Sequence, residues 1–162
     1  DWFTEACAMV RDAGGVVIAD EVQAAAGAVP LLHLGDVVAD AAGDRGLRRV
    51  GLLGTAYTME QPFLRDRIAT RHGVEVVTPG ADDRAQTHRV IYDELVQGEV
   101  VDASRTALEA VEATLVADGC DGIILGCTEL ELLLAADDGP VPRLATARLH
   151  ALAIAEAALG EI

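Results

Sequence analysis

Short apolar runs alternate with amphipathic segments along this chain of 162 residues. The apolar runs are bounded by glycine, proline or polar residues, which is typical of strands buried on both faces. Strands are predicted at residues 16–19, 29–34, 49–55, 74–78, 123–125 and 141–144, and helices at 20–26, 37–42, 58–71, 86–97, 104–117, 128–134 and 146–159. These repeated strand–helix units predict an α/β fold with a parallel sheet covered by helices.

Two pairs of polar residues indicate where helices begin. Thr58 with Gln61, and Thr128 with Glu131, match the capping box, in which a threonine is followed three positions later by Glu or Gln. Pro62 is compatible with the first turn of a helix. The sequence therefore predicts helices that open at Thr58 and Thr128.

A weak internal repeat relates residues 12–19 to residues 118–125. Each copy is followed by a short helical segment and by a strand that contains proline. This pattern favours two related α/β lobes with a cleft between them. The alternative is coincidence among segments rich in Ala, Gly and Val.

The composition indicates a soluble protein with an aliphatic core. Hydrophobic residues make up 51% of the chain but aromatic residues only 3%, and the length suits one domain with a substantial core. No apolar run has the length needed to cross a bilayer. Cys7, Cys120 and Cys127 lack the paired spacings of a disulfide framework or a zinc site. We therefore expect a reduced, cytoplasmic protein without a bound metal.

Charge excludes several classes of partner and cofactor. The net charge of −15 argues against nucleic acid and anionic membranes, because binding to phosphates needs clustered cations. All twelve basic residues are arginine, and the chain has no lysine. A pyridoxal phosphate Schiff base and a Walker phosphate loop both require lysine. No cofactor is therefore expected.

The candidate chemistry lies at the predicted carboxyl ends of strands, where parallel sheets place their active sites. Thr55, Thr58 and Cys127 all follow such strands. Cys127 stands just before a predicted helix, whose free N–H groups and dipole favour a thiolate. We therefore expect a lowered thiol pKa and preferential alkylation of Cys127 over Cys7 and Cys120. The alternative role for a free cysteine is that of a small buried hydrophobe.

Four segments carry a resemblance to a known family. These are Gly51–Met59, Val90–Gly98 with its Ile-Tyr-x-Glu-Leu-x-x-Gly pattern, Leu125–Leu130 with its Gly-Cys-Thr-Glu motif, and Leu149-His150. In this order they resemble the aspartate/glutamate racemase family, in its aspartate racemase or broad-specificity amino-acid racemase branch. The resemblance covers most of residues 28–160.

The resemblance implies a cofactor-independent enzyme with two pseudo-symmetric α/β lobes of the three-layer type. In that family, two thiols, or a thiol and a threonine, face each other across a bound amino acid. Cys127 would be one of these acid/base groups. Thr55, Thr58, Thr128 and Glu129 would bind the substrate, the first two through its carboxylate. Glu129 would orient the ammonium or influence the thiol, although the helix start alone also favours an acid there.

Two histidines match family positions near the cleft. These are His33 and His150. For both, a supporting role through structural hydrogen bonds is expected rather than catalysis.

The first lobe departs from the family pattern. A Cys- or Thr-Asn-Thr motif should follow Ala19, but Asp20 begins a helix there. An aspartate usually found near Ala145 is also missing. We therefore expect a partial first lobe over residues 1–45, a complete second lobe over 46–145, and a C-terminal helix over 146–162 that returns to the first lobe.

The expected function is racemisation of aspartate, glutamate or a similar small amino acid through thiol acid/base transfer of the α-proton. A homodimer is expected. Because the first catalytic motif is missing, this chain alone should racemise slowly or not at all. The alternatives are a non-catalytic remnant, a ligand-binding scaffold, or a related enzyme such as a hydantoin racemase or maleate isomerase.

Overall fold

The computed structural model describes residues 32–135 and 138–159. The expected strand at 16–19, the expected helix at 20–26, Cys7 and the first copy of the internal repeat lie outside the described residues. The same holds for residues 29–31 of the expected strand at 29–34.

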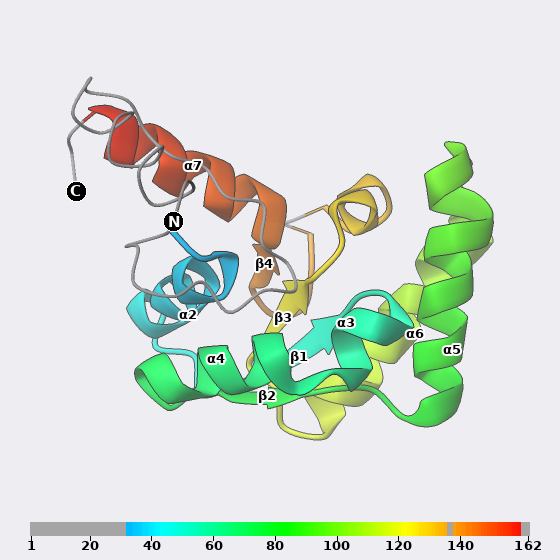
Figure 1. Ribbon diagram of the computed structural model, residues 1–162. Coiled ribbons are helices and arrows are strands. Elements are labelled where there is room, and N and C mark those ends of the chain that lie inside the picture. The colour runs from blue at the N-terminus through cyan, green and yellow to red at the C-terminus, as the bar shows by residue number, and fades with distance from the viewer. Residues whose placement is uncertain (1–31, 136–137, 160–162) are drawn as a thin grey trace.

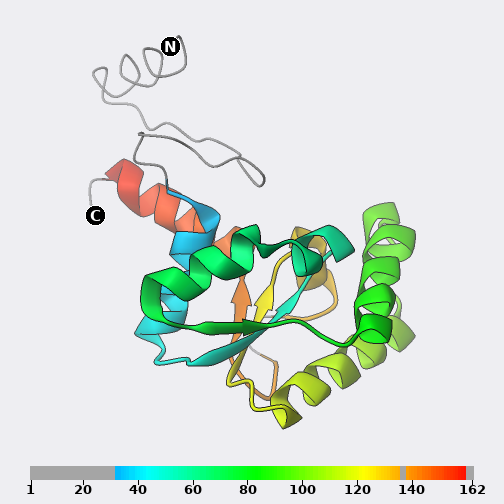
Figure 2. The same ribbon diagram turned by 60° about the horizontal axis from the view of Figure 1, so that its bottom comes forward.

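The described residues form a parallel sheet in the order β2-β1-β3-β4. Its strands are β1 (Arg49–Leu53), β2 (Glu75–Val77), β3 (Gly122–Leu125) and β4 (Arg143–Ala145). They lie side by side in Figure 2. All four residues of β3 are buried, as expected for a strand covered on both faces. The predicted α/β class and parallel sheet are thereby confirmed.

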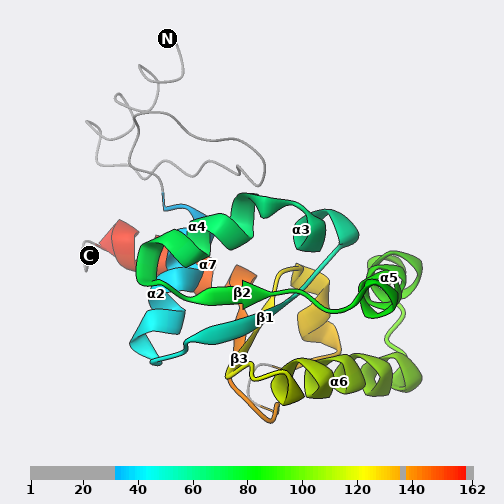
Figure 3. The ribbon, with the colours of Figure 1, turned by 90° about the horizontal axis from the view of Figure 1, so that it is seen from below.

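Helices cover both faces of this sheet. The α-helices are α2 (Leu34–Asp44), α3 (Ala56–Glu60), α4 (Pro62–His72), α5 (Ala81–Arg89), α6 (Asp102–Ala117) and α7 (Thr146–Leu159). A π-helical segment, η1 (Val90–Glu94), and two 3-10 segments, η2 (Leu95–Gln97) and η3 (Thr128–Leu132), complete the described elements. Figure 1 shows α7 beside α2, and Figure 3 shows the sheet between α4 on one side and α6 on the other.

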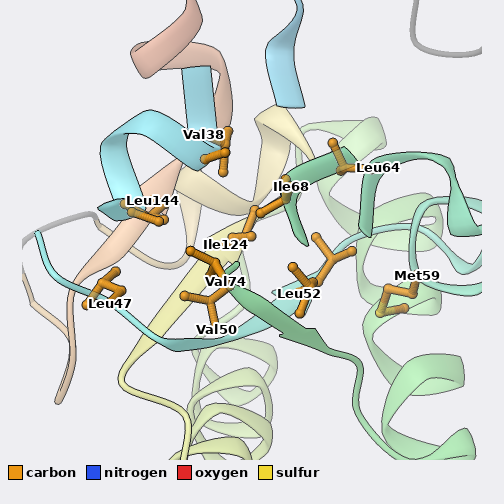
Figure 4. Close-up of a cluster of buried hydrophobic side chains, with 13 residues drawn as sticks. Val38, Leu47, Val50, Leu52, Met59, Leu64, Ile68, Val74, Ile124 and Leu144 are labelled. Carbon is orange, nitrogen blue, oxygen red and sulfur yellow. The ribbon is translucent and has the colours of Figure 1, made fainter. Parts of the chain in front are cut away.

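Successive side chains along each strand point to opposite faces of the sheet. The core is therefore divided into two clusters, one on each face. The cluster under α2 and α4 includes Val38, Ala42, Val50, Leu52, Ile68, Ile124 and Leu144 (Figure 4). The cluster under α6 and η1 includes Leu53, Ile91, Leu108, Val111, Leu115, Ile123 and Leu125. Each fully buried aliphatic side chain stabilises the fold by about 1.5–3 kcal/mol. Helix α2 packs in the same hydrophobic cluster as the sheet. The predicted boundary between the two lobes at residue 45 stays a prediction.

Gly51 allows α6 to approach the middle of β1. A Cβ atom at this position would lie 2.7 Å from Leu115 Cδ1 and 2.9 Å from Ile123 Cδ1. Any larger residue would therefore force the side chains of Leu115 and Ile123 to move.

Most predicted elements are confirmed with small shifts in their bounds. Helix α7 has the predicted bounds. Helix α6 begins two residues early and ends as predicted. The predicted strand at 29–34 is wrong at its described end, because Leu34 opens α2. His33 caps this helix, with Nδ1 accepting from the Gly35 N–H at 3.0 Å. Histidine is not among the residues that usually mark a helix start.

The predicted helix over 58–71 is two helices. Thr55, not Thr58, caps α3, with its Oγ1 accepting from the Thr58 N–H at 3.3 Å. Gln61 has ψ 142° and makes no side-chain cap bond. Pro62 explains the break, because a residue before proline is driven out of the helical region. The capping box at Thr58 is therefore wrong.

The predicted helix over 86–97 begins earlier, and it changes from an α-helix to a π-helix and then to a 3-10 helix. Helix α5 starts at Ala81, directly after Gly80, and is followed by η1 and η2. The extended backbone of Gly80 lets the helix open at once.

A buried ion pair joins α6 to β4. The Arg143 guanidinium donates to both carboxylate oxygens of Glu112, at 2.8 and 2.5 Å, and their side chains are 3% and 1% exposed. Arg143 Nη1 also donates to the Ala135 carbonyl at 2.7 Å. Removing one partner of a buried pair leaves the other charge uncompensated. The pair therefore ties the segment after η3 to α6 and β4.

We predict that Glu112→Ala lowers the free energy of unfolding by about 3–5 kcal/mol, because it leaves the Arg143 charge buried without its carboxylate. Chemical denaturation monitored by circular dichroism would measure this. The matched control is Arg67→Ala, which removes an exposed bidentate pair with Asp36 and should cost about 0–1 kcal/mol. Equal losses in the two variants would contradict the prediction.

Candidate active site

Two loops meet where β1 and β3 end. The strands pair in parallel with Leu53 opposite Leu125, and the Gly126 N–H donates to the Leu53 carbonyl at 2.7 Å. Cβ atoms at Gly54 and Gly126 would lie 3.2 and 3.3 Å from Thr58 Cγ2. The methyl group of Thr58 therefore packs against both glycines. Thr58 thus lies beside the loop that carries Cys127, and the roles of both residues in a site stay predictions.

Cys127 and Glu129 form a hydrogen-bonded pair in the loop after β3. The Cys127 thiol donates to Glu129 Oε2 at 2.8 Å. The Thr128 hydroxyl donates to the same oxygen at 2.6 Å. Cys127 is half-buried and packs on the cluster that includes Leu53 and Leu125. One carboxylate oxygen thus receives two hydrogen bonds beside a thiol in apolar surroundings.

Burial raises the pKa of the Cys127 thiol to about 12, and the hydrogen bond to Glu129 adds to this rise. The thiol is therefore protonated at neutral pH. Hydrogen bonds from Cys127 and Thr128 hold the pKa of the Glu129 carboxyl below its ordinary value, so Glu129 is ionised. Both shifts have one cause in common, because the bond between the groups favours a neutral thiol and a charged carboxylate.

The predicted lowering of the Cys127 pKa is wrong. The capping box that suggested it does not form, because Cys127 rather than Thr128 is the N-cap of η3 and makes no side-chain cap bond. Segment η3 is a five-residue 3-10 helix, so few peptide dipoles add up at its start. The nearby Glu129 charge and burial both favour the neutral thiol. Burial also raises the pKa of Cys120.

The loop after β1 is held by its own threonines and by α5. Thr55 Oγ1 lies 3.1 Å from Thr58 Oγ1. The Ala56 N–H donates to Nδ1 of His88 at 3.2 Å. The sequence analysis missed His88 because its pairing with Ala56 spans 32 positions and has no local pattern.

Three further contacts support the loop that carries Cys127, and the sequence analysis missed them as well. The Thr146 hydroxyl donates to the Leu125 carbonyl at 2.8 Å, in a buried position at the start of α7. Beyond η3, Arg105 donates to the Leu133 carbonyl, and Arg143 to the Ala135 carbonyl. The loop is therefore anchored at both ends by residues far away in sequence.

His33 and His150 lie at the junction of α2 and α7. His33 caps α2 through the Gly35 N–H, and His150 Nε2 lies 2.8 Å from the Leu32 carbonyl. These are the structural hydrogen bonds expected of the two histidines. A supporting role at the site stays a prediction.

In the described part of the chain, no three His, Cys, Asp or Glu side chains gather as metal ligands would. None of the helices in residues 32–135 and 138–159 has the length and apolar character needed to span a membrane.

Comparison with known proteins identifies relatives of this chain. The family model described as Asp/Glu/hydantoin racemase matches residues 4–154. An uncharacterised protein encoded in the pnlA 3′ region of Pectobacterium carotovorum subsp. carotovorum is 33% identical over 104 residues, which cover 64% of this chain and 67% of that protein.

Solved structures of similar proteins agree with the match to the Asp/Glu/hydantoin racemase model. A candidate Asp/Glu racemase from Yersinia pestis has 46% identity and a TM-score of 0.77, and an aspartate racemase homologue from Pyrococcus horikoshii OT3 has 32% and 0.74. The Picrophilus torridus aspartate racemase, at 21% identity and a TM-score of 0.60, shares the fold. Each match covers 81% of this chain but only 57%, 57% and 54% of the respective relatives. The chain thus spans a little over half the length of these proteins.

The family model covers most of the chain, and the structural neighbours share its parallel sheet and helices. The chain belongs to the Asp/Glu/hydantoin racemase family.

Proposed function

We propose that the protein is a cofactor-independent amino-acid racemase that acts on aspartate, glutamate or a similar small amino acid, with Cys127 as an acid/base group. The observation that carries this proposal is the Cys127–Glu129 pair beside the Thr55–Thr58 loop. Family membership supports the reaction type. The likeness to an aspartate racemase homologue at 32% identity supports an amino-acid substrate.

A thiol with a high pKa suits transfer of an α-proton. The α-proton is a very weak acid, so its removal needs a strong base, and the carbanion that results needs an acid to reprotonate it. In one direction, the Cys127 thiolate takes the proton, and the C–H electron pair stays on Cα and spreads into the carboxylate. In the other, the Cys127 thiol gives its proton to Cα. Its pKa of about 12 makes the thiolate a strong base and the thiol the resting form.

Glu129 has two roles in this proposal. Its charge keeps the proton on Cys127 until substrate binds, because their hydrogen bond favours the thiol. The same ionised carboxylate can accept a hydrogen bond from the substrate ammonium. A cation beside Glu129 would weaken its hold on the thiol proton and lower the thiol pKa. The thiol proton would then leave to solvent, which the half-buried Cys127 can reach, so that the base forms only when an α-proton is in place.

The Thr55–Thr58 loop and Thr128 complete the proposed substrate site. The hydroxyls of Thr55 and Thr58 lie at the end of β1, next to the Cys127 loop. They would donate hydrogen bonds to the substrate carboxylate, whose charge increases as the carbanion forms. The absence of lysine from the sequence supports proton transfer by side chains in place of a pyridoxal aldimine.

A binding role without catalysis is the second candidate. It is favoured by Asp20, which stands where the family has an Asn-Thr motif. A two-base racemase needs an acid and a base on opposite faces of the α-carbon. With Cys127 alone, the chain would exchange the α-proton with solvent on one face and return it to the same face.

We predict that the chain exchanges the α-proton of L-aspartate or L-glutamate with solvent, and that Cys127→Ser slows this exchange by about 10²–10⁴-fold because the proton carrier is lost. Proton NMR in heavy water would follow the loss of the α-proton signal. Cys120→Ala is the matched control, since Cys120 is buried in the core. Exchange that survives in Cys127→Ser, or that depends on added pyridoxal phosphate, would refute the proposal.

We predict further that α-deuteration precedes inversion, because only one face carries an identified proton carrier. The deuterated product, separated by chiral chromatography, should be mostly the original enantiomer. Deuteration and inversion at equal rates, with turnover in the usual enzyme range of roughly 1–1000 per second, would show that a second group completes the site. No exchange with any amino acid would favour the binding role.

A third prediction concerns the reactivity of Cys127. With a pKa of about 12, about one thiol in ten thousand is ionised at pH 8, so alkylation by iodoacetamide should be slow and should accelerate up to pH 11. Glu129→Gln should lower the pKa and speed alkylation by about tenfold for each pKa unit recovered.

Mass spectrometry of the Cys127 peptide would measure these rates. Glu131→Gln is the control, because it removes a neighbouring charge from the same segment η3 without removing the Glu129 carboxylate. Equal acceleration in both variants would mean that the general negative charge, not the hydrogen bond, sets the thiol pKa.

A further inference from the structure

Helix α5 contacts both ends of the short helix α3. At its start, the Ala56 N–H donates to Nδ1 of His88 at 3.2 Å. At its end, Glu60 lies 3.6 Å from the guanidinium of Arg84. Arg84 and His88 are one helical turn apart on α5. Figure 3 shows α3 lying alongside α5. The backbone of the Thr55–Thr58 loop is thus attached to a longer element.

We propose that His88 is a positioning residue, which fixes the Thr55–Thr58 loop in its substrate-binding conformation through the Ala56 amide. This inference rests on the proposed function, in which Thr55 and Thr58 bind the substrate carboxylate. His88 itself need not touch the substrate.

The Ala56 amide needs a partner from outside its own helix. It belongs to the first residue of α3, and the first N–H groups of a helix have no acceptor within it. Thr55 Oγ1 already accepts from the Thr58 N–H. His88 supplies the acceptor for Ala56, so the peptide plane between Thr55 and Ala56 is fixed. The direction of the Thr55 side chain depends on that plane.

The imidazole of His88 is itself held in place. Its ring lies 4.6 Å from the ring of Tyr92, one turn further along, with an interplanar angle of 50°. Helix α5 is fixed at its other end, where Arg84 Nη1 donates to the Pro79 carbonyl at 2.7 Å. Nδ1 of His88 accepts this hydrogen bond through its lone pair. The feature that matters is an acceptor at the Nδ1 position.

Two substitutions of His88 distinguish the effect of the hydrogen-bond acceptor from the effect of the aromatic ring. His88→Phe keeps an aromatic ring against Tyr92 but cannot accept from Ala56. His88→Asn offers its Oδ1 near the position of Nδ1. Glu60→Gln is the control, because it weakens the other contact between α3 and α5, an ion pair with a half-exposed carboxylate, and leaves Ala56 unchanged.

The experiment uses the full chain and two readouts. The first is hydrogen exchange of the Ala56 amide, measured by NMR. The second is the dissociation constant of L-aspartate and of L-glutamate, from amide shifts of Thr55 and Thr58. We expect His88→Phe to speed Ala56 exchange and to weaken binding by about three- to tenfold, the loss of one hydrogen bond. His88→Asn should restore both, and Glu60→Gln should match the wild type.

Each outcome decides a separate claim. Unchanged Ala56 exchange in His88→Phe would overturn the proposal. Faster exchange with unchanged affinity would also overturn it, because His88 would then only stabilise the fold. A wild-type chain that binds neither amino acid would count against the proposed function. The role of His88 in holding the loop would in that case be decided by the Ala56 exchange rates alone.

Discussion

The parallel pairing of β1 with β3 determines where Thr55, Thr58 and Cys127 lie. Because the pairing places Leu53 opposite Leu125, the loops that follow the two strands leave the sheet side by side. Glycines at 54 and 126 allow close contact between these loops, and Thr58 fills the space with its methyl group. A shift in register by one residue would turn the apolar side chains of each strand to the opposite face. The two clusters of the core therefore hold the register, and with it the site.

Electrostatics and burial both raise the pKa of the Cys127 thiol. A thiol at the start of a long helix would be ionised more easily. Here the helical segment is short, the surroundings are apolar and the nearest charge is the Glu129 carboxylate. All three features favour the neutral thiol. In the proposed mechanism, the free site stores its proton on sulfur, and a substrate ammonium at Glu129 would favour release of that proton to solvent.

The sequence predicts those parts of the fold that depend on local patterns. The apolar run before Cys127 gives β3, and the periodicity after Thr146 gives the bounds of α7. Local reasoning failed where two local signals conflicted, as at Gln61, where a helix signal met the restraint from Pro62. It also failed for the pKa of Cys127, which depends on burial, and for His88, which pairs with a residue 32 positions away. A single sequence carries no signal for such pairings.

The anchoring of η3 links the site to helix α6 and strand β4. Arg105 on α6 and Arg143 on β4 hold carbonyls beyond η3, and Arg143 is in turn held by Glu112 on α6. Glu112 and Arg143 form a unit in which each buried charge depends on the other. Changes at these two positions should be tolerated when made jointly and rejected when made singly. In a library of variants selected for activity, we expect substitutions at 112 and 143 to co-vary although neither side chain bonds to Cys127. Redesign of the site must therefore treat the surface helix α6 as part of it.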